Sequence, residues 1–274
     1  MIVHTHFEYT DDDFAAIASL IYKRVGIDLH SNKKKLVYNR LVGRLRAHQL
    51  SRFAQYIALL NDQYHVEWEY FVNALTTNLT YFFREPYHFT LLKQHVRDHY
   101  VGNRVIEPIR IWCSACSTGE EAYSIAITMA EAFESYQPPV KILATDLNTQ
   151  VLATAKHGRY TLEQLGSASE EQKKRFFHFN KAAKMYEVKP EIQALVHFKQ
   201  LNLMDHQWPM QKQFHTIFCR NVLIYFNRET QHSILTKFAN YLPKDALLFL
   251  GHSESCPAEQ TPFKLLKQTA YRRV

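Results

Sequence analysis

The sequence is poor in the features that mark membrane, secreted and metal-binding proteins. Only four of the 274 residues are cysteine, and no apolar run reaches the ~18 residues that a membrane span needs. The first residues show no basic region followed by an apolar one, so no secretion signal is expected. Cys113 and Cys116 form a CxxC pair, but no second pair completes a metal site. We expect a cytoplasmic protein with no metal and no membrane insertion.

Acidic residues are missing from one stretch of the chain. Between Asp28 and Asp62 there is no acidic residue but there are seven basic ones, a local excess that equals the net charge of +7 of the whole chain. This pattern indicates a partner with clustered negative charge, either nucleic acid or an acidic protein helix. A solvated helix face is the alternative that stays open, because surface lysines are common. The basic residues are Lys33, Lys34, Lys35, Arg40, Arg44, Arg46 and Arg52.

The N-terminal 76 residues show helical spacing and no strand pattern. Apolar residues recur in steps of three and four from Phe14 to Val25, and again from Tyr38 to Leu45 within a helix expected over 31–48. Similar patterns follow at 53–60 and 67–76. We therefore expect a helical domain over 1–76, joined by a linker or lid over 77–88 to a larger domain.

The stretch from Ile109 to Ala130 predicts a strand, a turn of small residues and a helix, which is the first unit of a nucleotide-binding α/β sheet. The helix begins with Glu120 and Glu121. The positive end of a helix dipole can bind a pyrophosphate. Two acids at the same helix N-terminus add negative charge there and so disfavour a pyrophosphate. They fit S-adenosylmethionine (SAM) better than NAD, and the GxGxxG motif of NAD enzymes is absent, with Gly119 alone in the turn.

Later segments continue the α/β pattern. A second strand ends at Asp146, which is placed to accept hydrogen bonds from a ribose. Buried strands are expected at 216–219 and 246–250, and an edge hairpin at 263–272. The segment from about 165 to 198 breaks the rhythm and predicts an inserted helix with small antiparallel strands, one of them at Leu195–Phe198. The expected fold is a doubly wound α/β sheet over 89–274 with a small β-subdomain inserted at 167–200.

Several motifs, in this order, resemble those of the CheR-type chemotaxis methyltransferases. The resemblance covers the chain from about Phe14 to Arg272, and the basic segment KKKLVYNRLVGRLR also fits it. The motifs are TTNLTYFFRE, IRIWCSACSTGEEAYSIA, ILATDLNTQVLATAKHGRY, FCRNVLIYF and LFLGHSES.

The resemblance implies transfer of a methyl group from SAM to glutamate side chains of methyl-accepting receptors, leaving S-adenosylhomocysteine. It places Arg84 and Tyr225 nearest the reacting groups, and it implies a monomer that docks on the cytoplasmic helical domain of a receptor through Lys33, Arg40, Arg44 and Arg46. Whether the inserted sheet also grips a receptor tail stays open. The implied SAM contacts are Asn78, Thr80, Arg84, Glu121, Asp146, Asn202, Leu203, Asn221 and Val222.

Two other functions remain as alternatives. A nucleic-acid methyltransferase would share the fold and explain the basic helix, although the segment from Arg220 to Tyr225 is not the NPPY-like loop that base methylation typically uses. A SAM-binding sensor that docks on receptors without methylating them is the second. The glutamate reaction agrees with the lack of an obvious histidine–acid pair, because a carboxylate with a pKa of about 4.3 is already ionised and needs no general base.

Overall fold

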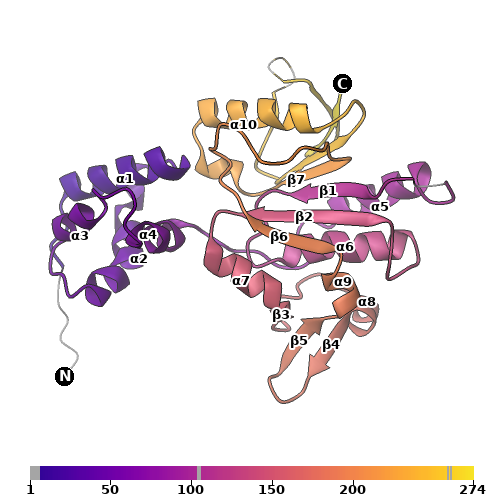
Figure 1. The fold of residues 1–274 in the computed structure, drawn as a ribbon, viewed down its shortest axis with the longest axis horizontal. Coiled ribbons are helices and arrows are strands. Elements are labelled where there is room, and N and C mark those ends of the chain that lie inside the picture. The colour runs from indigo at the N-terminus through magenta and orange to yellow at the C-terminus, as the bar shows by residue number, and fades with distance from the viewer. Residues whose placement is uncertain (1–6, 104–105, 258, 260) are drawn as a thin grey trace. The chain divides into compact units, whose positions relative to one another are not determined.

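The computed structural model describes residues 7–103, 106–257, 259 and 261–274. The chain divides into two compact units (Figure 1). The helical unit comprises the residues up to Thr77 together with Tyr225–Thr230, and the sheet unit comprises Asn78–Ile224 and Gln231–Val274. The helical unit is thus assembled from two separate stretches of chain.

The helical unit packs four α-helices around apolar residues at helical spacing. Thr10 caps the first helix with its side chain, and Gly26 ends it. Val37, Leu41 and Leu45 face the core from the second helix, which a short 3-10 turn, Ser31–Lys33, precedes. This agrees with the helical pattern of the sequence, although the spacing placed Tyr38 rather than Val37 in the stripe. The helices are α1 (Asp11–Val25), α2 (Lys34–Ala47), α3 (Phe53–Leu59) and α4 (Glu67–Leu75).

A buried carboxylate joins α2, α3 and α4. Glu67, which is 1% exposed, accepts two hydrogen bonds of 2.7 Å from the Arg44 guanidinium. Tyr56 and His48 add one contact each, both at 2.7 Å. Burial alone would raise the pKa of Glu67, but these partners hold it at about 2. Since a buried charge is tolerated only when it is paired, Glu67 fixes the register of the three helices.

The sheet unit is built on seven strands in the order β6-β2-β1-β7-β8-β10-β9. The first five are parallel to one another, and β10 and β9 form the antiparallel hairpin expected at one edge, with β10 antiparallel to β8. The strands are β1 (Ile109–Cys113), β2 (Val140–Asp146), β6 (Val196–Gln200), β7 (Thr216–Cys219), β8 (Leu247–Leu250), β9 (Phe263–Lys267) and β10 (Ala270–Arg273).

Helices cover both faces of this sheet. Ile111 of β1 belongs to the apolar cluster formed with α6 (Glu120–Ala132) and α5 (Tyr87–His99). The next side chain, Trp112, points the other way and packs edge-on against Phe238 of α10 (Arg228–Tyr241). Figure 1 shows α6 and α10 on opposite sides of the strands. Successive side chains of β1 therefore pack against helices on opposite faces of the sheet, as in a doubly wound fold.

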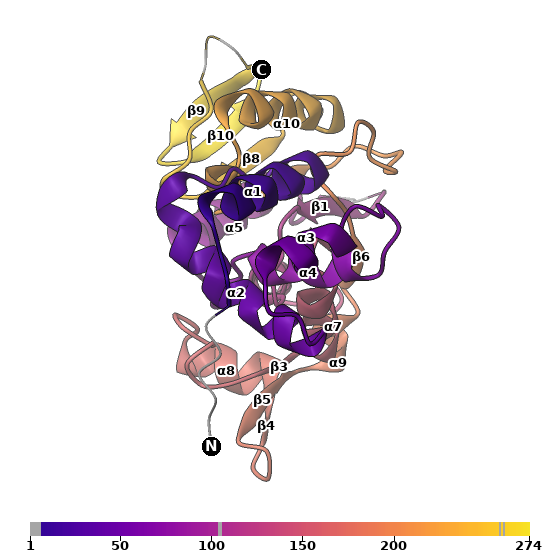
Figure 2. The ribbon, with the colours of Figure 1, turned by 90° about the vertical axis from the view of Figure 1, so that its left-hand side faces the viewer.

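A second, three-stranded antiparallel sheet has the order β3-β5-β4. It follows α7 (Thr149–His157) in the chain, and its β4–β5 hairpin extends away from the main sheet (Figure 2). One expectation was wrong: residues 195–198 do not join this sheet, because Val196–Gln200 pairs in parallel with β2. Short alternating strands look alike in sequence, and only the pairing distinguishes them. The remaining elements are β3 (Arg159–Tyr160), α8 (Glu170–Phe176), β4 (Phe177–Asn180), β5 (Met185–Val188), α9 (Pro190–Gln193) and the 3-10 turn Leu223–Tyr225.

Within the described part of the chain, no helix has the length and apolarity to cross a bilayer.

The Glu67 cluster predicts an acid-sensitive helical unit. A pKa of Glu67 that is lower in the folded state adds to the free energy of unfolding. This addition is complete at pH values above the unfolded pKa of about 4.3, and it is lost as the pH falls through the folded value of about 2. We expect Glu67→Gln to lower the free energy of unfolding by about 3 kcal/mol at pH 7 and to flatten its decline below pH 4. Urea unfolding followed by circular dichroism at several pH values measures both effects. The exposed Glu69→Gln is the control, and equal stability of the two variants would contradict the role of Glu67.

Candidate functional site

The carboxyl ends of five parallel strands meet at one edge of the main sheet. The chain leaves β1 to form β2 on one side, and later forms β7 on the other side of β1. The connecting helices α6 and α10 therefore leave this edge on opposite faces. In open α/β sheets such a switch point is where ligands bind. The loops that follow β1, β2, β6, β7 and β8 carry most of the polar groups described next, and the segment before α5 carries the others.

The turn after β1 is shaped by a glycine. Gly119 caps α6 at a φ of +99°, and a Cβ there would lie 2.8 Å from the Tyr160 hydroxyl and 2.9 Å from the Ala155 Cβ. Any other residue would push the turn away from α7. Two positions earlier, Ser117 adopts a φ of +49° and directs its backbone N–H at the carboxylate of Asp146.

Asp146 joins the loops after β1 and β2. Its carboxylate accepts the backbone N–H of Ser117 at 2.8 Å and that of Asn148 at 2.9 Å. Asn148 itself caps α7 with its side chain, as expected. Burial raises the pKa of Asp146, and the two N–H groups oppose that rise. Since a carboxylate has about four acceptor positions, Asp146 retains capacity for two ligand hydroxyls.

The remaining implied residues on this side follow β6, the neighbour of β2. Asn202 accepts the Met204 backbone N–H at 3.0 Å, and the carbonyl of the buried Leu203 accepts from Lys237 at 2.8 Å. Asn202 and Leu203 are therefore held at the same sheet edge as Asp146.

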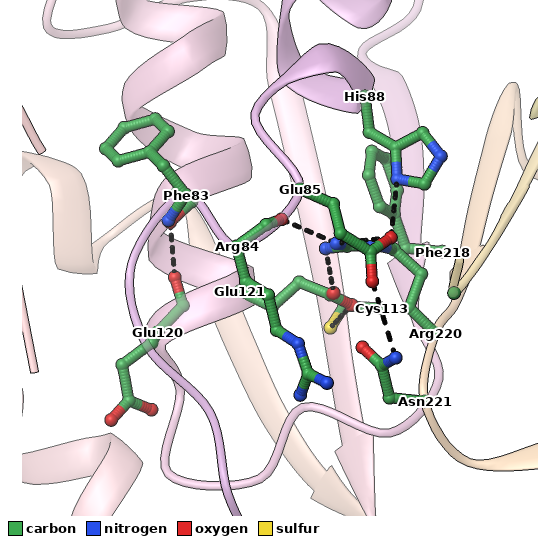
Figure 3. Close-up of polar contacts among 12 residues, drawn as sticks. Phe83, Arg84, Glu85, His88, Cys113, Glu120, Glu121, Phe218, Arg220 and Asn221 are labelled. Carbon is green, nitrogen blue, oxygen red and sulfur yellow. Dashed lines mark hydrogen bonds and ion pairs between the residues drawn. The ribbon is translucent and has the colours of Figure 1, made fainter. Parts of the chain in front are cut away.

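A buried arginine organises the other half of the edge (Figure 3). Arg220, directly after β7, donates to Glu121 at 2.6 Å and lies 3.1 Å from the carboxylate of Glu85. Its Nη2 also donates to the carbonyl of Arg84. The side chain of Arg220 is 1% exposed and those of the two glutamates are 10% exposed. Three distant segments are thereby fixed by one guanidinium.

The two glutamates differ in their protonation behaviour. Burial would raise the pKa of Glu85, but Arg220 and His252 outweigh it and hold the value at about 2. Burial raises the pKa of Glu121, and Arg220 opposes that rise. The other oxygen of Glu121 accepts the thiol of the buried Cys113 at 3.2 Å. The expected contact of Glu121 with a cofactor stays a prediction, and the structure adds that the side chain is held by Arg220.

The segment from Asn78 to Glu85 lies beside these loops. Its carbonyl at Asn78 accepts from the Ser117 hydroxyl at 3.1 Å, and the N–H of Phe83 donates to Ser124 of α6 at 2.9 Å. The Arg84 guanidinium donates to the Leu79 carbonyl at 3.0 Å. Figure 3 shows this guanidinium pointing away from Arg220. Thr80 is of intermediate exposure.

The loop after β7 carries Asn221 and Val222. Asn221 has a φ of +59°, and its side-chain amide lies 3.4 Å from Glu85. The backbone N–H groups of both residues donate to Glu254, in the loop after β8, at 2.9 Å.

Four residues of these segments have strained backbone conformations. Phe83, Glu85, Ser117 and Asn221 all have positive φ values, between +49° and +59°. Such conformations cost of order 1–3 kcal/mol each and persist only where surrounding contacts impose them. Five other non-glycine residues with positive φ values lie elsewhere in the described part of the chain, so strain alone does not single out this edge.

Nine of the implied site residues thus lie in the sheet unit, and hydrogen bonds link most of them into two groups around Asp146 and Arg220. Tyr225 falls in the helical unit, so its place beside the reacting groups stays a prediction. In the described ranges, no set of three histidine, cysteine or acidic side chains is arranged to hold a metal ion.

The four basic residues that the resemblance assigns to docking divide into two kinds. Arg40 donates to the carbonyls of Leu75 and Thr76 at 2.8 Å, and Arg44 is bound to Glu67, so both support the helical unit itself. Lys33 is exposed, and Arg46 is exposed beside the Phe7 ring. Of these four residues, an interaction surface would therefore depend first on Lys33, in the 3-10 turn before α2, and on Arg46 within α2.

The sequence did not predict four residues that shape the loops at this sheet edge: Arg220, Glu85, Glu254 and Gly251. One signal was available for the first of them. A lone arginine directly after a fully buried strand must find a buried acid, because charged side chains are almost never fully buried unless paired.

Comparisons with known proteins assign both parts of the chain. Residues 12–76 match the family model described as CheR methyltransferase, all-alpha domain, and residues 78–272 match CheR methyltransferase, SAM binding domain. The chain is similar to chemotaxis protein methyltransferase 2 of Pseudomonas aeruginosa, with 44% identity over 97% of this chain and 94% of the relative. It is also similar to the chemotaxis protein methyltransferase of Salmonella typhimurium, with 43% identity over 96% and 90% of the two chains. The corresponding protein of Escherichia coli is 42% identical over 96% and 91%.

The Asp146 geometry yields a direct test. We expect Asp146→Ala to abolish SAM binding measured by calorimetry, because the change removes the predicted ribose acceptor and frees the Ser117 N–H. The control is Asp98→Ala, an exposed aspartate at the end of α5, which should bind SAM as the unmodified protein does. Unchanged affinity in Asp146→Ala would rule out its assignment to the ribose.

Proposed function

Because the chain belongs to the CheR methyltransferase family, and so is a SAM-dependent methyltransferase of chemotaxis, we propose that its substrates are glutamate side chains of methyl-accepting receptors. The products are glutamate methyl esters. The observation that carries the proposal is the pair of hydrogen-bonded groups around Asp146 and Arg220 at the switch point of a SAM-binding sheet.

The residues present fit SAM. The carboxylate of Asp146 suits the ribose hydroxyls, and Glu121 suits the amine of the methionine part. Asn202, Leu203, Asn221 and Val222 lie after strands on either side of β1, where the adenine and its sugar would be held. Asn78 and Thr80 would close over them, and Arg84 would bind the methionine carboxylate or orient the acceptor.

The proposed reaction needs no general acid or base from the protein. When bound, SAM supplies an electrophilic methyl group on a positively charged sulfur. The acceptor glutamate is ionised at neutral pH, so no residue of this chain has to remove a proton. The task of Arg84 and Tyr225 is to hold the acceptor oxygen in line with the methyl group, and such positioning is worth several kcal/mol.

The two units would divide the work. In our proposal the helical domain, residues 1–76, docks on the cytoplasmic helical domain of the receptor, and residues 89–274 bind SAM, with 77–88 acting as linker and lid. The β4–β5 hairpin, which lies within 167–200, would provide a further receptor contact. The exposed cations of α2 would act mainly on the rate of association, as exposed charges do.

The proposal predicts alkali-labile methylation. Receptor-containing membranes incubated with the protein and methyl-labelled SAM should gain label that alkali releases as methanol. SAM binding without any transfer would favour a docking sensor. Label appearing in added DNA or RNA, and not in receptor, would favour a nucleic-acid methyltransferase. Label that resists alkali would exclude a glutamate ester.

Docking through Lys33 and Arg46 predicts that receptor methylation depends on these charges and on the salt concentration. Lys33→Glu combined with Arg46→Glu should leave SAM affinity unchanged and lower receptor methylation several-fold at low ionic strength, with a smaller difference at high salt. Lys264→Glu with Lys267→Glu, which changes the charge equally on the exposed strand β9, is the matched control. Equal methylation by both double variants would remove α2 from the docking surface. Arg40 and Arg44 are unsuitable for this test, because their reversal would disrupt the helical unit.

A further inference from the structure

One buried carboxylate binds two loops of the sheet unit together. Glu254, which is 6% exposed, accepts the backbone N–H of Gly251 at 2.6 Å within its own loop. From the loop after β7 it accepts the N–H groups of Asn221 and Val222 at 2.9 Å each and that of Leu223 at 2.7 Å. Four backbone donors thus share one side chain, which no local feature of the sequence requires.

Only an ionised carboxylate can satisfy this arrangement. Its two oxygens offer about four acceptor positions and no hydrogen, whereas an amide of the same shape offers one oxygen and turns two N–H donors toward backbone donors. Unpaired buried donors are costly, so the loop after β7 would move rather than tolerate an amide.

Gly251 completes the contact from the other side. A Cβ at this position would lie 2.5 Å from the side-chain nitrogen of Asn221, 2.8 Å from its backbone nitrogen and 2.8 Å from the Glu254 carboxylate. The absence of a side chain at Gly251 therefore permits the close approach of the two loops. Asn221 is held at its positive φ between Gly251 and Glu254.

We propose that Glu254 is a positioning residue for SAM: it holds the Asn221–Val222 loop in the shape that receives the cofactor, without touching the cofactor itself. This proposal rests on the assignment of Asn221 and Val222 to the SAM site made above. Because Glu254 occupies the backbone N–H groups of the loop, those two residues are left to meet SAM through side chains and carbonyl oxygens.

The test compares two variants that disturb the contact in different ways. Glu254→Gln replaces the acceptor, and Gly251→Ala inserts a methyl group between the loops. Each should raise the KM and the Kd for SAM about tenfold or more, which corresponds to one lost buried hydrogen bond. The kcat at saturating SAM should fall much less, because Asn221 and Val222 are assigned to SAM binding, whereas the acceptor is assigned to Arg84 and Tyr225.

Matched controls separate positioning from general loss of stability. Glu67→Gln removes another buried carboxylate with several partners, this one in the helical unit. Gly43→Ala adds a methyl group where nothing lies within 4 Å. Both should keep the Kd for SAM of the unmodified protein, and thermal melting without SAM records the stability of all four variants.

Three outcomes decide the proposal. Weaker SAM binding in both loop variants, with kcat largely kept, supports it. A folded Glu254→Gln or Gly251→Ala with unchanged SAM affinity overturns it, and if Glu254→Gln does not fold, Gly251→Ala decides alone. Failure of the unmodified protein to bind SAM would instead contradict the SAM site itself.

Discussion

The structure of the site depends on one buried positive charge. Removing Arg220 would leave the buried carboxylate of Glu121 without its cation, and an uncompensated buried charge of this kind costs several kcal/mol. Glu85 would keep His252 as a partner. The same guanidinium holds the Arg84 carbonyl, so the segment before α5, the start of α6 and the end of β7 are fixed together. The polar groups offered to a ligand are therefore already ordered before the ligand arrives, which reduces the ordering cost of binding.

Carboxylates perform a similar task at three other places, two of them buried. Glu67 joins helices, Asp146 joins the loops after β1 and β2, and Glu254 joins the loops after β7 and β8. In each case a carboxylate with several acceptor positions accepts hydrogen bonds from groups that regular secondary structure does not pair. The sheet supplies a rigid edge, and ionised side chains fix the irregular backbone that projects from it. Function in this fold is thus carried by loops whose shape is specified by charge.

Much of the fold could be predicted from local pattern. The alternation in β1, the helical spacing of α1 and the cap at Asn148 are all encoded within a few residues, and the position of Asp146 at a strand end followed from them. The ion network was not predictable in the same way, because Arg220 and Glu121 are 99 positions apart and Arg220 and Arg84 are 136 apart. Local pattern also misplaced Val196–Gln200 and gave no sign that Arg40 and Arg44 serve inside the helical unit, since pairing between distant segments decides both.

The discontinuous composition of the helical unit has a consequence for biosynthesis. Its four helices leave the ribosome early, but Tyr225–Thr230 is made roughly 150 residues later. At about 5–20 residues per second, the unit waits on the order of ten to thirty seconds for its last piece. During that interval the N-terminal helices lack the Tyr225 carbonyl, which accepts the Asp28 N–H in the complete chain, and the side chain of Phe226, which is buried there.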